Sequence, residues 1–157
     1  RFENPNADIT LGFSTDLNYK NWNFTMSWRG SFGNYVYNNV DSNLGFKLNL
    51  LNTAFPDVIS NGVENILETG FVNGGTERYL SDYYVQDASF VKLDNVGIGY
   101  NFNNVFGEGT NLKLNATVQN ALIITDYEGL DPEVFGGIDY NIYPRPRIYT
   151  LGLNLNF

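Results

Sequence analysis

The sequence contains neither cysteine nor histidine among its 157 residues. The absence of cysteine excludes disulfide bonds and thiolate metal sites. The absence of histidine removes the usual general base and the commonest transition-metal ligand, and it excludes hydrolases that depend on a Ser-His pair. No run of 18 apolar residues occurs either, which excludes a transmembrane helix.

Positive charge is also scarce, with nine Lys and Arg against 17 Asp and Glu and a net charge of −8. This balance argues against nucleic acid as a partner. Aromatic residues, in contrast, reach 16%, although all hydrophobic residues together make up only 43%. Membrane β-barrels combine these two traits, because half of each strand faces a wet lumen while aromatic residues gather at the membrane interfaces.

The last residues, PRPRIYTLGLNLNF, alternate strictly between apolar and mostly small or polar side chains. One face would carry Arg147, Tyr149, Leu151, Leu153, Leu155 and Phe157, and the other Ile148, Thr150, Gly152, Asn154 and Asn156. A soluble protein seldom ends on an apolar strand with an unpaired edge. A strand that closes an outer-membrane barrel has no free edge, and its apolar side faces lipid.

Alternation elsewhere predicts an all-β chain with strands at about 8–19, 22–37, 84–102, 111–126 and 146–157. A tight turn at Lys20-Asn21 would join the first two strands as a hairpin. In the third strand the apolar positions change parity between Leu93 and Val96, which predicts a β-bulge near Asp94-Asn95. Five strands cannot close a barrel, so we expect a segment of a larger antiparallel barrel.

The connections between these strands are alternately short and long, with long loops at about 39–82 and 127–144. Outer-membrane barrels show this asymmetry, with short periplasmic turns and long extracellular loops. The long loops are also rich in acidic residues, because six of the 17 lie in 39–82 and five in 126–143. A short helical pattern at Val63, Ile66 and Leu67 lies in the first of them.

Aromatic residues fall at the strand ends that this topology makes periplasmic. Tyr19, Trp22, Tyr100 and Phe102 would form an interfacial belt there, with Phe157 at the same end. Charged residues within strands, Asp16, Arg29 and Lys113, occur on the polar face. On the lipid face at mid-bilayer, a Lys or Arg would cost roughly 2–4 kcal/mol.

Other interpretations compete with the barrel. The alternating strands could instead form a soluble or surface-attached β-sandwich that binds glycan through its loops. The acidic loop at 126–139 has no EF-hand spacing, so it supplies no named metal ligand. Asp131/Glu133 and Glu64/Glu68 could be imagined as glycosidase pairs, but both lie in loops without an implied pocket. We expect neither an enzyme nor a cofactor site.

Aromatic residues in the long loops leave a further choice open. They could stack on sugar rings, pack the loops together or meet a partner protein, and the sequence does not choose between these roles. They are Phe46, Phe55, Phe71, Tyr79, Phe135 and Tyr140.

Four stretches, taken in order, resemble the C-terminal end of SusC/RagA-type TonB-dependent transporters. They are NPNADITLGFSTDLNYKNWNFTMSWRGSFGNYVYN (4–38), YVQDASFVKLDNVGIGYNF (84–102), VQNALIITDYEGLDPEV (118–134) and NIYPRPRIYTLGLNLNF (141–157). No single motif is decisive, but four in the same order are specific. The chain starts at Arg1 without Met or a signal peptide, in keeping with a segment of a longer protein.

The resemblance implies a barrel of about 22 strands in the bacterial outer membrane, filled by an N-terminal plug that would lie outside this sequence. Oligosaccharides or peptides would be imported, driven by the TonB complex, with a SusD-type surface lipoprotein over the outer mouth. The barrel-assembly machinery would recognise the final strand through Tyr149, Leu151, Leu153, Leu155 and Phe157. Residues 147–157 would pair with the first barrel strand, outside this chain.

Overall fold

The computed structural model describes residues 3–51, 62–140 and 143–157. The chain divides into two compact units. The strand unit comprises Asp8–Phe32, Ser89–Asp126 and Pro144–Phe157, and the loop unit comprises Arg1–Ala7, Gly33–Ala88 and Tyr127–Tyr143. Each unit is built from segments far apart in the sequence, because the long connections leave the sheet and return to it.

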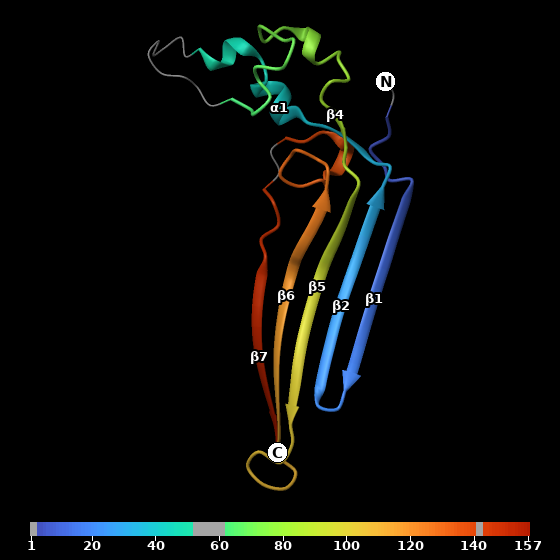
Figure 1. The fold of residues 1–157 in the computed structure, drawn as a ribbon, viewed down its shortest axis with the longest axis vertical. Coiled ribbons are helices and arrows are strands. Elements are labelled where there is room, and N and C mark those ends of the chain that lie inside the picture. Colours follow the sequence, from blue (N-terminus) through green and yellow to red (C-terminus); the bar gives the residue numbers. More distant parts are fainter. Residues whose placement is uncertain (1–2, 52–61, 141–142) are drawn as a thin grey trace. The chain divides into compact units, whose positions relative to one another are not determined.

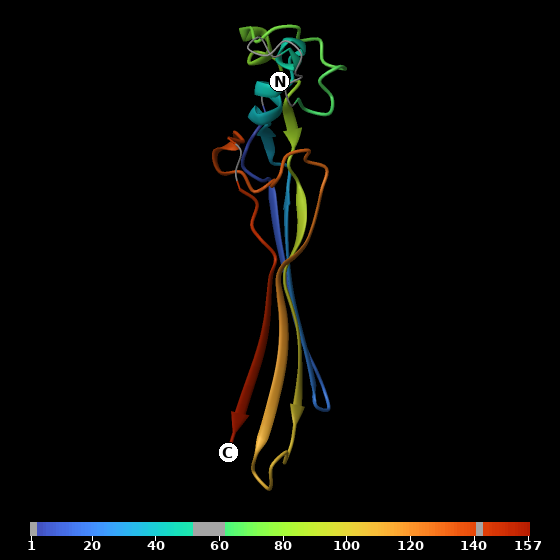
Figure 2. The same cartoon turned by 90° about the vertical axis from the view of Figure 1, so that its left-hand side faces the viewer.

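The strand unit is one antiparallel sheet of five strands, as the sequence predicted. Its order is β1-β2-β5-β6-β7 (Figure 1). The strands are β1 (Ile9–Tyr19), β2 (Trp22–Phe32), β5 (Phe90–Phe102), β6 (Asn111–Thr125) and β7 (Ile148–Asn156). Seen from its side, the sheet is a single layer (Figure 2).

Two short connections set the register of the sheet. The turn between β1 and β2 is made by Lys20, with a positive φ of 53°, and Asn21, and the hairpin then pairs without a slip from Tyr19↔Trp22 onward. The connection between β5 and β6 contains Gly107 and Gly109, whose φ values of 127° and 89° favour glycine. Because pairing next to both connections keeps the period of two, the alternation in the sequence becomes two chemically different faces.

The predicted β-bulge is confirmed. Ser27 pairs with Asn95 and Trp28 with Leu93, so Asp94 is an extra residue of β5 relative to β2. The register between β5 and β6 shifts at the same place, where Asn120 of β6 has a φ of 51°. This second irregularity was not predicted, although Asn tolerates the left-handed region better than most residues.

Two of the expected strands are each divided in the structure. The expected strand at 22–37 ends at Phe32 and resumes as β3 (Tyr35–Tyr37), and the one at 84–102 is split into β4 (Val85–Asp87) and β5. The first break lies at Gly33, whose φ is 81°. Beyond it, β3 and β4 form a separate two-stranded sheet in the loop unit.

The loop unit has a small core of its own, where Val36, Ala88 and Tyr127 are buried and Val134 packs against them. Its elements are α1 (Asn39–Leu44) and the 3₁₀ turns η1 (Lys47–Leu50), η2 (Thr76–Arg78) and η3 (Phe135–Gly137). The side chain of Asn38 caps α1 by accepting a hydrogen bond from the Asp41 amide at 3.0 Å.

The helical pattern expected at Val63, Ile66 and Leu67 forms turns rather than a helix. Ile66 is buried there, but Leu67 is 71% exposed, so the pattern does not define one buried face. No helix in the described part of the chain is long and apolar enough to cross a membrane.

Candidate functional site

The apolar face of the sheet is open to its surroundings. Leu151 is 87% exposed and Leu153 69%, so no second layer of the described chain packs on them. Further large apolar residues of this face are also exposed: Leu11, Phe13, Leu17 and Ile98. An apolar surface of this extent marks an interaction with a membrane or another molecule. The β-sandwich alternative, which requires these residues inside a dry interior, is therefore wrong for this sheet.

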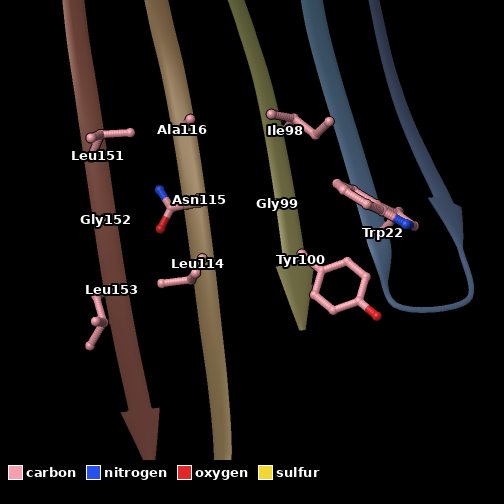
Figure 3. A pocket seen from close by; sticks show the side chains of 10 residues that line it. All are labelled: Trp22, Ile98, Gly99, Tyr100, Leu114, Asn115, Ala116, Leu151, Gly152 and Leu153. Carbon is pink, nitrogen blue, oxygen red and sulfur yellow. The ribbon is translucent and has the colours of Figure 1, made fainter. Parts of the chain in front are cut away.

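This apolar face is hollowed into a groove of about 450 Å³. Figure 3 shows the ten residues that line it, from Trp22 on β2 to Leu151 and Leu153 on β7. Ala116 lies directly between Ile98 and Leu151 in the cross-strand row. Because alanine has a single side-chain carbon, the surface of this row is lowest at Ala116, and the larger side chains of Ile98 and Leu151 form the sides of the groove.

The opposite face is polar and carries a smaller groove of about 320 Å³, lined mainly by Asn, Thr and Gly. Gly97 and Gly99 contribute backbone rather than side chains to its floor. A Cβ added to Gly97 would lie 2.7 Å from Thr25 Oγ1, closer than real Cβ contacts come. The glycines thus let polar side chains of adjacent strands approach the sheet surface.

Charge within the strands is concentrated where the bulge lies. Arg29 donates two hydrogen bonds to Asp94, Nε to Oδ2 at 3.0 Å and Nη2 to Oδ1 at 3.2 Å. The Arg29 guanidinium also lies 5.6 Å from the centre of the Phe90 ring. Lys92, directly opposite Arg29, is buried. Arg29 was predicted on the polar face and Asp94 at the bulge, but neither their ion pair nor the role of Lys92 was predicted. The parity change at the bulge was the signal that these residues lie together.

The four residues of the predicted aromatic belt lie together at one end of the sheet. Tyr19 pairs with Trp22, which in turn pairs with Tyr100. The Trp22 and Tyr100 ring centres are 4.7 Å apart, and those of Tyr100 and Phe102 are 4.6 Å apart, both edge-to-face. Edge-to-face contacts between rings are a favourable arrangement and stabilise this cluster. Their role at a membrane interface stays a prediction.

The predicted assembly signal lies on the last strand of the sheet. β7 pairs with β6 on one side, and on its other side it pairs with no strand among the described residues. Tyr149, Leu151 and Leu153 are exposed on the apolar face, and Phe157 is 95% exposed just beyond the strand. Leu155 continues the alternation opposite Leu112. The geometry leaves these side chains accessible, and their recognition by assembly machinery stays a prediction.

The loop aromatics divide into two groups. Phe71 packs within 6 Å of the rings of Tyr83 and Tyr84, and Phe46 lies 4.9 Å from the Arg78 guanidinium, so both help to pack the loop unit. Phe135 is fully exposed, and Tyr79 and Tyr140 are also exposed. Phe55 lies outside the described residues.

Acidic residues dominate the loop unit, which holds 12 of the 17 carboxylates but only three of the nine basic residues of the sequence. Burial raises the pKa of the Asp41 carboxyl, and the nearby carboxylates of Glu128 and Asp139 raise it further. Burial and the hydrogen bond to Asp139 raise the pKa of Tyr127. Across residues 3–51, 62–140 and 143–157, no three acidic residues are grouped so as to hold a metal ion.

A single antiparallel sheet with one exposed apolar face, one polar face and aromatic residues at its end has the architecture of an outer-membrane β-barrel wall. Comparison of sequences supports this class. Over 162 residues the chain is 38% identical to the TonB-dependent receptor SusC of Bacteroides thetaiotaomicron, covering 99% of this chain and 16% of SusC. It is 31% identical over 173 residues to the TonB-dependent receptor P3 of Formosa agariphila, covering 98% of this chain and 17% of that receptor.

Solved structures show the same fold. The RagAB peptide transporter aligns with a TM-score of 0.75 at 24% identity, covering 99% of this chain and 18% of the matched chain. The closed-closed state of the RagAB peptide importer aligns with a TM-score of 0.73, also at 24% identity and over the same shares. No family model matches the sequence.

The chain is homologous to SusC/RagA-type TonB-dependent receptors and spans about a sixth of the length of the curated relatives that it matches. TonB-dependent receptors are β-barrel proteins of the outer membrane, and the family transports nutrients rather than catalysing reactions. The resemblance seen in the sequence is thereby confirmed.

Proposed function

We propose that this chain forms five adjacent strands in the wall of a TonB-dependent importer. Its apolar face contacts lipid, and its polar face, with the glycine-floored groove, lines the lumen beside the plug. The importer takes up oligosaccharides or peptides together with a SusD-type lipoprotein, and the TonB complex drives transport through a part of the protein outside this chain. The observation that carries the proposal is the exposure of Leu151 and Leu153 on a sheet that aligns with RagA-type barrels.

The loop unit then supplies two extracellular loops at about 39–82 and 127–144. Its excess of carboxylates suits a solvated surface, and its exposed rings, Phe135 and Tyr140, are available to cargo or to the lipoprotein. The aromatic belt of Tyr19, Trp22, Tyr100 and Phe102 marks the periplasmic boundary. The final strand, through Tyr149, Leu151, Leu153, Leu155 and Phe157, carries the assembly signal and pairs with the first strand of the barrel.

Single-cysteine labelling of the full-length receptor in lipid vesicles tests the orientation of the sheet, since this chain contributes no cysteine of its own. Spin labels at Leu151→Cys and Thr150→Cys lie on adjacent residues and opposite faces. We expect the label at 151 to be relaxed by oxygen dissolved in the bilayer, and the label at 150 by a water-soluble nickel chelate. Equal protection of both labels from both reagents would contradict a lipid-facing sheet.

A further inference from the structure

The groove on the apolar face has a defined shape as well as an apolar lining. Two cross-strand rows form it, Trp22–Tyr100–Leu114–Leu153 and Ile98–Ala116–Leu151. The first row has two rings at one end, and the second row is lowest at Ala116. A flexible hydrocarbon chain can fill such a depression. Because the surrounding bilayer is as apolar as the groove, the chain gains van der Waals contact with the groove walls there rather than transfer out of water.

A cation lies near the Trp22 end of the first row. Lys20 is in the β1–β2 turn, one residue beyond the Tyr19–Trp22 pair, and its Nζ lies 5.4 Å from the centre of the Tyr19 ring. No hydrogen bond or ion pair from the described residues holds the Lys20 ammonium or the polar atoms of Trp22 and Tyr100. An anionic group at this rim would therefore meet an ammonium and two aromatic donors without displacing a protein partner.

We propose that the groove binds one phospholipid, with an acyl chain over Ala116 and the phosphate at Lys20. The inference rests on the proposed function, because it requires the apolar face to contact lipid. A phospholipid matches both features at once, since its phosphate complements Lys20 and its acyl chain continues the lipid-facing surface. It is favoured over lipopolysaccharide because the Lys20 turn and the aromatic belt lie at the end proposed to be periplasmic.

Native mass spectrometry of the full-length receptor, released from outer membranes in mild detergent, tests the site. Ala116→Phe fills the depression, and Ala116→Leu does so with less bulk if the first variant folds poorly. Thr15→Phe is the matched control, because Thr15 is on the apolar face of β1 but does not line the groove. Lys20→Gln removes the cation alone. Heat-modified mobility on a gel verifies that each variant is folded.

We expect the wild-type receptor and Thr15→Phe to retain one phospholipid. Ala116→Phe and Ala116→Leu should each reduce this retention several-fold, because the added side chain occupies the space of the acyl chain. Lys20→Gln should reduce retention of phosphatidylglycerol several-fold. Unchanged retention in both Ala116 variants, or retention of lipopolysaccharide instead, would overturn the inference.

A spin label at Leu11→Cys, outside the groove, separates this result from the proposed function. If oxygen reaches the label at 11 and the Ala116 variants retain phospholipid as the wild type does, only the phospholipid site in the groove is refuted. Loss of oxygen access at 11 refutes the lipid-facing sheet, and with it the groove.

Discussion

The guanidinium of Arg29 on β2 binds both carboxylate oxygens of Asp94, the extra residue of β5, at 3.0 and 3.2 Å. A bulge normally leaves its additional residue without a partner in the ladder. Here that residue gains a bidentate side-chain partner on the neighbouring strand, which fixes both the position of the bulge and the direction of its carboxylate. The bulge and the ion pair therefore stabilise one another.

Asp94→Asn should weaken this link modestly. The Arg29 and Asp94 side chains are 43% and 33% exposed, so solvent screens the pair and its coupling should not exceed about 1 kcal/mol. A double-mutant cycle with Arg29→Met, read from urea unfolding of the receptor in lipid, measures the coupling. Asp16→Asn is the control. Among the described residues, the hydrogen-bond donors to the Asp16 carboxylate are the neutral side-chain amides of Asn18 and Asn23. Equal coupling of Arg29 with Asp16 and with Asp94 would contradict a specific pair.

The five strands and the bulge were predictable, because both follow from side-chain parity along the chain. Val91 and Leu93 have the opposite parity to Val96 and Ile98, and only an extra residue can keep all four on one face. The partner of Asp94 was not predictable in the same way. Which polar side chain faces it depends on the register between β2 and β5, strands separated by more than 50 residues of sequence.

The breaks at the loop unit were missed for a related reason. Alternation resumes beyond Gly33 with Tyr35 and Tyr37, and one strand was therefore predicted, although the parity changes there from that of Trp28 and Phe32. The chain leaves the sheet because Asn34 forms two hydrogen bonds with Ala88. The Asn34 side-chain amide donates to the Ala88 carbonyl at 3.0 Å, and the Ala88 backbone amide donates to the Asn34 carbonyl at 2.9 Å. Such pairing is set by tertiary contacts, which outweigh local propensity.

Tyr127→Phe should loosen the loop unit. The Tyr127 hydroxyl donates a hydrogen bond of 2.8 Å to the buried Asp139 carboxylate. Losing a donor to a buried charged group costs about 1–3 kcal/mol. Hydrogen exchange of the Asp139 amide, which donates to the Tyr37 carbonyl at 3.0 Å, should accelerate accordingly. Tyr140→Phe, at a position that is 71% exposed, should leave the exchange rate unchanged. Equal effects of the two variants would show that the Tyr127 hydroxyl does not stabilise this unit.

The stability of the α1 region should depend on pH through Asp41. Burial, with the Glu128 and Asp139 carboxylates, raises its pKa above 3.8, while the hydrogen bond from Asn38 partly opposes the shift. The folded state therefore binds the Asp41 proton more tightly than the unfolded state does. Ionised Asp41 destabilises the fold at neutral pH, and this cost is relieved as the pH falls through the raised pKa.

Hydrogen exchange of the Gly45 amide, which donates to the Asp41 carbonyl, measures this effect once the intrinsic pH dependence of exchange is removed. Protection should increase as the pH is lowered from 7 through the raised pKa, and should no longer change once the pH is below 3.8. Asp41→Asn should flatten the profile and increase protection at neutral pH. Asp82→Asn, a carboxylate of the same unit, is the control. A wild-type profile that Asp41→Asn leaves unaltered would assign the pH dependence to other carboxylates.

Phe157→Ala should reduce the amount of receptor that reaches the outer membrane without reducing the stability of the protein that does. The Phe157 ring is 95% exposed and lies beyond the last paired residue, so its removal leaves no cavity in the sheet. Quantitative blotting of outer-membrane fractions gives the yield, and urea unfolding of the purified receptor gives the stability. Asn156→Ala, one residue earlier on the polar face, is the control and should assemble normally. A fall in yield that is the same for both variants, or that follows a fall in unfolding free energy, would mean that the ring stabilises the barrel instead of serving as a signal.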